Sequence, residues 1–196
     1  CGAMGSLGLI TDVSIKVLPE FKAGHTLTFD MTIEAALEAM LKWANLSLPI
    51  TGMSHFKGLL YVRLQGGAGG VASASTFLGG EKLASKAAEI FWQAIREGSF
   101  LQPRHDQTLW RWSGASDTLA NTVPNTSLIN WAGAERWVLT EALDTPLEGL
   151  VQYQGGDRLA EVYGAISAPQ QALQQRIKHA FDPHGILNAG RLYAWM

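Results

Sequence analysis

A run of alternating side chains near the start of the chain most restricts what it can fold into. Between residues 9 and 18 the odd positions hold Leu9, Thr11, Val13, Ile15 and Val17, and the even positions are mostly polar. This period of two, rich in β-branched residues, predicts a half-buried strand that ends at Pro19. Because a half-buried strand needs strand neighbours, the start of the chain is expected to belong to a sheet.

Strand and helix patterns alternate in the next part of the chain. Residues 27–29 predict a short strand, and Asp30 or Thr32 can cap the helix that follows. Another strand is predicted at residues 59–64, and a later helix ends near Gly98. Two sets of apolar residues recur at helical spacing: Ile33, Leu37, Met40, Leu41 and Ala44, then Leu83, Ala87, Ile90, Phe91 and Ala94.

From residue 108 the pattern changes to short strands rich in aromatic residues. Strands are predicted at 108–112, 127–131, 136–140 and 157–163, and residues 132–134 can turn the middle pair into a hairpin. Pro169 opens a last helix, and residues 182–185 have the composition of a type I turn. The order of elements predicts an α+β fold with a mostly antiparallel sheet and helices on one face.

The composition excludes several classes of protein. Apolar residues make up 47% of the 196 residues and charged residues 16%, which allows a large core and is unlike a disordered chain. The net charge is −2 without any run of Lys or Arg, so a nucleic-acid partner is not expected. No apolar stretch reaches the roughly 20 residues that cross a bilayer. The single cysteine, Cys1, fits a reducing compartment.

Patterns for metal, covalent or nucleotide chemistry are weak. The five histidines show no metal-binding spacing, and His179 and His184 are expected to be solvated residues at a helix end. Residues 4–8 do not match the G-x-S-x-G pattern of hydrolases. Residues 67–72 do match G-x-G-x-x-A, which can hold a pyrophosphate at a helix N-terminus. No parallel strand with an acidic end follows, so a flexible turn is the favoured interpretation.

Large and charged side chains within the predicted strands allow two interpretations. Four tryptophans lie in or beside strands, where core packing is expected and a stacking surface is the alternative: Trp110, Trp112, Trp131 and Trp137. Three arginines lie in the same kind of segment: Arg63, Arg111 and Arg136. An outward-facing guanidinium is the simpler expectation. A buried one would need a carboxylate partner, which an anionic substrate could supply.

Three stretches, residues 48–64, 128–137 and 181–193, resemble one protein family in order and spacing. They are similar to the "LP.SG…G.LYVRL.G", "L.EWGGAQRWL" and "FDP.GIFNPGRLY" stretches of the glycolate oxidase FAD-binding subunit, or E-type subunit. That family belongs to the FAD-linked oxidases of the vanillyl-alcohol oxidase type. Ala189 stands where the family usually has Pro. The resemblance covers essentially the whole chain.

The resemblance implies the C-terminal portion of an FAD-dependent 2-hydroxy-acid oxidoreductase subunit. Its complex would oxidise glycolate to glyoxylate, with a catalytic flavoprotein subunit and an iron–sulfur subunit as partners. Residues 1–19 would be a remnant strand of the flavin-binding domain, residues 20–167 a ferredoxin-like cap domain, and residues 168–196 a helix and tail returning to the flavin-binding domain. The implied location is cytoplasmic, including a peripheral position at the inner face of the membrane through the complex.

The resemblance also implies which residues lie against FAD. The stretch at residues 5–10 would approach the pyrophosphate through backbone N–H groups that small side chains leave accessible. The implied contacts are Gly5, Ser6, Leu7, Gly8, Ile10, Asn188, Gly190 and Arg191. The H-x-H-x-G-D-G-N segment of the related catalytic subunit is absent from the sequence. No acid, base or metal ligand is therefore assigned, and a non-catalytic docking subunit is the alternative function.

Most residues that grip FAD in this family would precede Cys1. We therefore expect this fragment to purify without stoichiometric flavin and to be inactive alone, although FAD is implied for the full-length protein. We also expect an exposed apolar patch around residues 9–18 and the C-terminal tail. Self-association is one way of covering such a patch.

Overall fold

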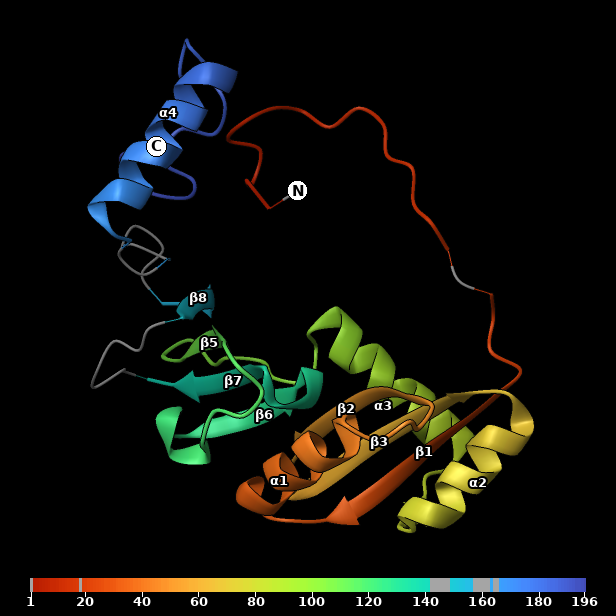
Figure 1. The fold of residues 1–196 in the computed structure, drawn as a ribbon. Coiled ribbons are helices and arrows are strands. Elements are labelled where there is room, and N and C mark those ends of the chain that lie inside the picture. The colour runs from red at the N-terminus through yellow and green to blue at the C-terminus, as the bar shows by residue number, and fades with distance from the viewer. Residues whose placement is uncertain (1, 18, 142–148, 157–162, 164–165) are drawn as a thin grey trace. The chain divides into compact units, whose positions relative to one another are not determined.

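The computed structural model describes residues 2–17, 19–141, 149–156, 163 and 166–196, and the chain forms two compact units (Figure 1). The terminal unit combines Cys1–Leu18 with Asp157–Met196, and the sheet unit is Pro19–Gly156. The assignment of these parts to a flavin-binding domain and a cap domain stays a prediction.

An open antiparallel sheet of eight strands is the frame of the sheet unit within its described residues. Its strands are β1 (Ala23–Asp30), β2 (Ile50–Phe56), β3 (Leu59–Gly66), β4 (Glu81–Lys82), β5 (Thr108–Ser113), β6 (Thr126–Asn130), β7 (Glu135–Thr140) and β8 (Leu150–Gly155). Their spatial order is β4-β1-β3-β2-β6-β7-β5-β8. The helices of the sheet unit are α1 (Ile33–Ala44), α2 (Ala68–Leu78) and α3 (Ser85–Glu97). The predicted α+β class and the antiparallel sheet are confirmed.

A tight hairpin joins β2 to β3 and sets their register. Phe56 pairs with Leu59, so only Lys57 and Gly58 form the loop. Both have positive φ, 51° and 80°, as a two-residue turn between twisted antiparallel strands requires. Neither β2 nor this hairpin was predicted from the sequence.

The glycine-rich segment after β3 is a turn into a helix and lacks the surroundings of a dinucleotide site. Gly67 caps α2 without a side-chain hydrogen bond. Strand β3 pairs antiparallel with both β1 and β2, whereas a dinucleotide-binding turn needs a parallel β-α-β unit. The antiparallel pairing thus agrees with the rejection of a dinucleotide site, but the expected flexible turn is shorter than residues 67–72, because α2 already begins at Ala68.

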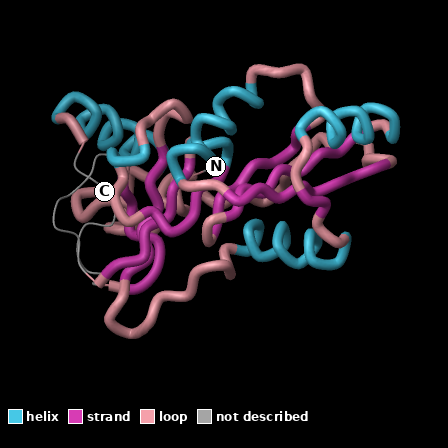
Figure 2. The backbone as a smooth tube through the Cα atoms, turned by 90° about the horizontal axis from the view of Figure 1, so that it is seen from below, coloured by secondary structure: helices cyan, strands magenta, loops and turns pink. Residues whose placement is uncertain are grey.

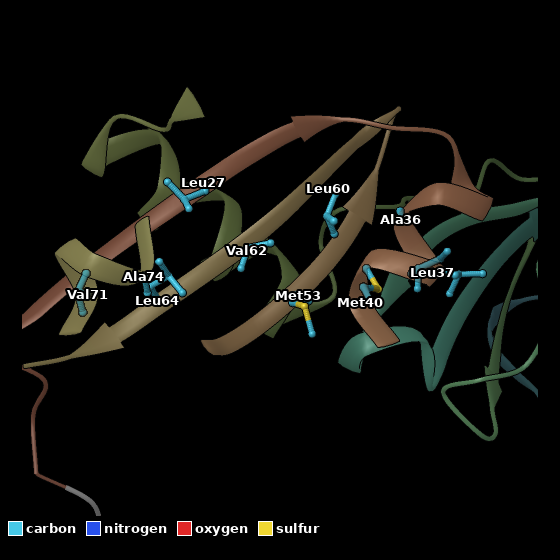
Figure 3. Close-up of a cluster of buried hydrophobic side chains, with 11 residues drawn as sticks. Leu27, Ala36, Leu37, Met40, Met53, Leu60, Val62, Leu64, Val71 and Ala74 are labelled. Carbon is cyan, nitrogen blue, oxygen red and sulfur yellow. The ribbon is translucent and has the colours of Figure 1, made fainter. Parts of the chain in front are cut away.

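The main core fills one face of the sheet. Leu60, Val62 and Leu64 alternate along β3 with no exposed surface, and they point toward α1 and α2 (Figure 3). Met40 of α1 and Val71 of α2 are also fully buried in this cluster. Thr32 caps α1, because its hydroxyl accepts a hydrogen bond from the N–H of Ala35 at 3.3 Å.

Helix α3 covers the opposite face of the sheet. Tyr61 of β3, which points away from the main core, stacks on Phe91 of α3 with ring centroids 3.7 Å apart. Ile95 of α3 packs against a second cluster that contains Leu109, Leu128 and Trp137. Helices therefore lie on both sides of the strands, as the right-hand part of Figure 2 shows. The prediction of helices on one face was wrong, because periodicity reveals an amphipathic helix but not the face it covers.

Residues 9–17 form no strand with any described residue, which corrects the prediction of a half-buried remnant strand. Leu9, Ile15 and Val17 are 87%, 78% and 80% exposed. Their alternating pattern is typical of a strand, but no described strand pairs with them. In the tail, Phe181 and Ile186 are also exposed. The expected exposure of apolar side chains in these two segments is confirmed.

Helix α4 (Ala168–Phe181) belongs to the terminal unit and begins as predicted beside Pro169. Ser167 and Gln170 form a capping box at its start. The N–H of Gly185 donates to the carbonyl of Asp182 at 3.1 Å, which confirms the predicted turn. The strand predicted at 157–163 lies outside the described residues except for Tyr163. None of the helices in the described ranges combines the length and the apolar character that a membrane span needs.

Candidate functional site

Two places gather polar residues, one in each unit, and the first is in the terminal unit. The side-chain amide of Asn188 donates to the carbonyl of Met4 at 2.7 Å, across 184 positions of sequence. Gly5 has a φ of 76°, which favours glycine, and a Cβ there would lie 2.8 Å from that amide nitrogen and displace it. Ser6 is fully buried beside it. The structure thus brings together three of the residues predicted to contact FAD.

A buried lysine connects the same two segments. The ammonium of Lys178 donates to the carbonyl of Ser6 at 2.7 Å, to the carbonyl of Leu187 at 2.7 Å and to the carboxylate of Asp182 at 2.6 Å. All three of its N–H groups are therefore used. We call Ser6, Lys178, Asp182 and Leu187 the terminal clamp. The resemblance pointed to this tail, but no sequence pattern indicated that Lys178 takes part.

Asp182 is the acceptor centre of the clamp. Besides Lys178, it accepts hydrogen bonds from the backbone N–H groups of Leu187 at 2.8 Å and Ile186 at 3.2 Å. The hydrogen bond from Lys178, followed by that from Leu187, lowers the pKa of Asp182 from 3.8 to about 2. The carboxylate is therefore ionised at every pH at which proteins are normally studied.

The other predicted FAD contacts are in exposed backbone. Gly8 and Ile10 lie in the extended segment, and a Cβ on Gly8 would meet no atom within 4 Å. The N–H of Gly190 donates to the carbonyl of Met196, and that of Arg191 donates to the carbonyl of Asn188. Leu7 is half-buried, and the Arg191 side chain is exposed. Gly8, Ile10 and Arg191 could therefore reach a ligand, whereas Ser6 and Asn188 are occupied within the chain.

The second place is a cavity of about 1090 Å³ in the sheet unit, on the face that α3 covers. Residues from all eight described strands line it, and α3 forms a wall. The polar residues that line it include Thr26, Thr51, Arg63, Gln65, Arg96, Arg111, Asn130 and Glu135. The aromatic residues are Trp43, Trp92, Trp131, Trp137 and Tyr153. Aromatic walls with a few convergent polar groups are typical of ligand sites.

Arg63 of β3 lies between the sheet and α3 in this cavity. Its Nε donates to the hydroxyl of Thr51 at 3.0 Å, and its Nη2 donates to the Thr51 carbonyl at 2.9 Å. Its guanidinium carbon lies 4.7 Å from the centre of the Trp92 ring. The Trp92 indole N–H in turn donates to the hydroxyl of Thr26 at 3.0 Å. The guanidinium is held in one orientation by β2 and α3 together.

Gly52 makes this packing possible. A Cβ at this position would lie 3.2 Å from the Trp92 ring and 3.4 Å from Nη2 of Arg63. The absence of a side chain on β2 therefore lets the indole approach the strand closely. The register of β2 against β3 shifts between Ile50 and Gly52, which places this irregularity at the cavity floor.

A second arginine in the cavity is already paired. Nε of Arg111 donates to the Glu135 carboxylate at 2.6 Å, and the Asn130 amide donates to the other carboxylate oxygen at 3.0 Å. Glu135 is buried, so its charge is compensated by two donors rather than by water. The Arg111 guanidinium also lies 5.1 Å from the centre of the Trp131 ring.

Comparison with known proteins covers nearly all of the chain. It is 35% identical, over 198 aligned positions, to the glycolate oxidase subunit GlcE of Escherichia coli strain K12. The chain is GlcE-like. The alignment includes 98% of this chain and 55% of that relative, so the chain spans about half of the relative's length. No protein-family model and no solved structure matches the sequence.

The strand arginines of the GlcE-like chain differ from the expectation that they face outward. Arg136 is fully buried, and its Nη1 and Nη2 donate to the carbonyls of Leu119 and Thr118. Arg111 and Arg63 are partly buried and line the cavity. Burial lowers the pKa of both Arg136 and Arg63 below the ordinary value for arginine. Backbone carbonyls, which a sequence pattern does not reveal, replace the expected carboxylate at Arg136.

The strand tryptophans of the GlcE-like chain divide into two groups. Trp112 and Trp137 are buried and Trp110 is partly buried, as core packing predicts. Trp131 is 60% exposed, so the core interpretation is wrong for this ring. Trp131 and Ala132 have positive φ, 49° and 53°, and lie in the turn that joins β6 to β7 as an antiparallel hairpin. His179 and His184 are exposed, as expected for solvated residues.

The terminal clamp of the GlcE-like chain should depend on pH only in strong acid. Because the folded-state pKa of Asp182 is depressed, its contribution to stability is full above pH 3.8 and is lost as the pH falls through about 2. We expect the Leu187 amide resonance to titrate with a midpoint near 2 in an NMR pH series. An Asp182→Asn variant should abolish this titration. A midpoint at or above 3.8 in the wild type would contradict the clamp.

Proposed function

We propose that this chain is the cap and closing portion of an FAD-dependent 2-hydroxy-acid oxidoreductase subunit of a glycolate oxidase complex. The complex would oxidise glycolate to glyoxylate and pass electrons through flavin to an iron–sulfur subunit. The observation that carries the proposal is the 35% identity to GlcE across 98% of the chain. In this proposal residues 20–167 form the cap, and residues 1–19 and 168–196 belong to the flavin-binding domain. The separation of the terminal unit from the sheet unit supports that division.

The terminal unit suits a supporting contact with FAD rather than a complete binding site. Bound FAD would supply the electron-transfer chemistry. We propose that Gly5, Gly8 and Ile10 approach it through exposed backbone and that Arg191 adds a positive charge. The clamp through Ser6 and Lys178 would hold this backbone in place. Leu7, Asn188 and Gly190 would support the same surface.

The exposed segment at residues 9–17 fits the same proposal. Its alternating apolar side chains are the pattern of a strand that is buried on one face. We propose that it pairs with a strand from the part of the subunit that this chain does not span. This pairing would cover the apolar surface and bring Gly8 to the flavin.

A chimaera tests the proposed function directly. The matching segment of Escherichia coli GlcE would be replaced by this chain and co-expressed with the other subunits of its complex. We expect glycolate oxidation in extracts, whereas GlcE lacking the segment should give none. A chimaera that assembles with its partners but does not support glycolate oxidation would refute the proposal.

A substitution at Gly8 can distinguish a catalytic subunit from the alternative, a docking subunit without turnover. The absent histidine segment favours the alternative. Because a Cβ at Gly8 would meet no atom within 4 Å, Gly8→Phe should leave the chain folded but obstruct flavin. In the chimaera we expect this change to remove bound flavin and activity together. Gly69→Phe on α2, where a Cβ also meets nothing, is the matched control. Flavin loss with full activity would establish the docking function.

A further inference from the structure

One edge of the Arg63 guanidinium is available to a ligand. Nε and Nη2 are held by Thr51, whereas Nη1 has no hydrogen-bond partner among the described residues. The Thr51 hydroxyl is itself committed, because it donates to the side chain of Gln65 at 2.8 Å. Thr51 therefore fixes the guanidinium without neutralising it. The edge formed by Nη1 and the second N–H of Nη2 remains unused.

No carboxylate of the described residues lies within 4 Å of Arg63. Of the two acidic residues that line the cavity, Glu135 is paired with Arg111, and Glu89 with Lys86 outside the cavity. The cationic side chains in the lining are Arg63, Lys82, Arg96 and Arg111. Arg96 lies near enough that, after burial, its charge is the second cause of the lowered pKa of Arg63. The charge of Arg63 is left uncompensated beside another cation.

The surroundings of Arg63 also favour pairing of its guanidinium with an anion over its hydration by water. The Trp92 ring lies against one face of the guanidinium, and the lack of a side chain at Gly52 permits this close packing. Charge-assisted hydrogen bonds are stronger where aromatic side chains replace water. A partly desolvated, oriented and unpaired arginine is arranged to bind an anion that enters the cavity.

We propose that the cavity beneath α3 binds an organic carboxylate and that the free edge of Arg63 is its main contact. Two coplanar N–H donors match the two oxygens of a carboxylate. With Arg111 neutralised by Glu135, one uncompensated arginine suits a monoanion better than a dianion. Arg96, which pairs with Glu97 at 3.8 Å, and Lys82, which lies 2.7 Å from Nε2 of His25, also line the cavity and add positive charge to it. The choice of a 2-hydroxy acid as the probe rests on the proposed function.

Titration of this chain with glycolate tests the site without turnover. Binding is followed at constant ionic strength by NMR, through the backbone amides of Val62 and Leu64 and the Nε–Hε resonance of Arg63. We expect saturable shifts at these positions. Because a charge-assisted hydrogen bond is lost, Arg63→Gln should weaken binding about tenfold or more. Arg104→Gln removes the same charge from an exposed position outside the cavity and should change nothing.

A second variant and a second anion complete the test. Arg63→Lys retains the charge but loses the planar edge, so it should also bind weakly while its amide spectrum remains that of the wild type. Sulfate at the same ionic strength should bind more weakly than glycolate. Shifts that do not saturate, equal affinity of Arg63→Gln and wild type, or equal binding of sulfate would overturn the proposal. If this chain binds glycolate but the chimaera is inactive, only the proposed function is refuted. If the chimaera is active but this chain does not bind glycolate, only the proposed site is refuted.

Discussion

Replacing Arg136 by alanine is expected to lower the free energy of unfolding of the sheet unit by about 3 kcal/mol. Arg136 has no exposed surface, and its guanidinium donates to the carbonyls of Leu119 and Thr118. It also lies 5.0 Å from the centre of the Trp112 ring. Truncation would leave two acceptors without their donor and a cavity beside the ring. Urea unfolding followed by tryptophan fluorescence measures the loss.

Two variants show whether the fork geometry of Arg136 is responsible. Arg136→Lys keeps a positive charge but cannot donate to both carbonyls in one plane, so we expect an intermediate loss. Arg104→Ala removes an exposed arginine and should change the free energy of unfolding by less than about 0.5 kcal/mol. If Arg136→Ala is as stable as Arg104→Ala, the buried guanidinium has no structural role.

Replacing Lys178 by methionine should release the tail of the chain from the segment around Ser6. Methionine has a similar length but donates no hydrogen bond, so the carbonyls of Ser6 and Leu187 and the carboxylate of Asp182 lose their shared partner. We expect hydrogen exchange at the Ile186 and Leu187 amides to become about tenfold faster or more. Amides of the main core in the sheet unit should keep their protection.

The control for Lys178→Met lies on the same helix. Arg176 of α4 is exposed, so Arg176→Met removes one positive charge without touching the clamp. Its exchange rates at Ile186 and Leu187 should equal those of the wild type. Unchanged exchange in Lys178→Met as well would mean that the backbone turn alone holds the tail.

Local patterns in the sequence predicted most helices and several strands correctly. Helix α1 follows from its apolar spacing and from Thr32, which can cap it without any distant partner. Helix α3 ends at Gly98, whose φ of 68° is the left-handed conformation expected after a helix. Strand β2 was missed because Gly52, Ser54 and His55 interrupt its apolar pattern. Its stability comes from its neighbours β3 and β6, which are set by the fold.

The candidate sites depended on distant contacts and were harder to predict. The turn after Asp182 follows from Pro183 and Gly185, but the partner of its carboxylate was not foreseen. For Arg63 the simpler expectation was an outward-facing guanidinium, with burial against an anionic partner as the alternative. Its position in a cavity depends on the face that α3 covers, and no periodicity specifies that face. The resemblance identified the segments but not the contacts that join them.

Helix α3 has a further consequence for the cavity it encloses. None of its residues is fully buried, and its contacts with the sheet include the rings of Phe91 and Trp92 and the side chain of Ile95. An element held by so few buried groups detaches at a small fraction of the free energy needed to unfold the sheet. Brief lifting of this helix is therefore expected to widen a cavity that is already open to solvent, and it would shorten the time that a bound solute stays.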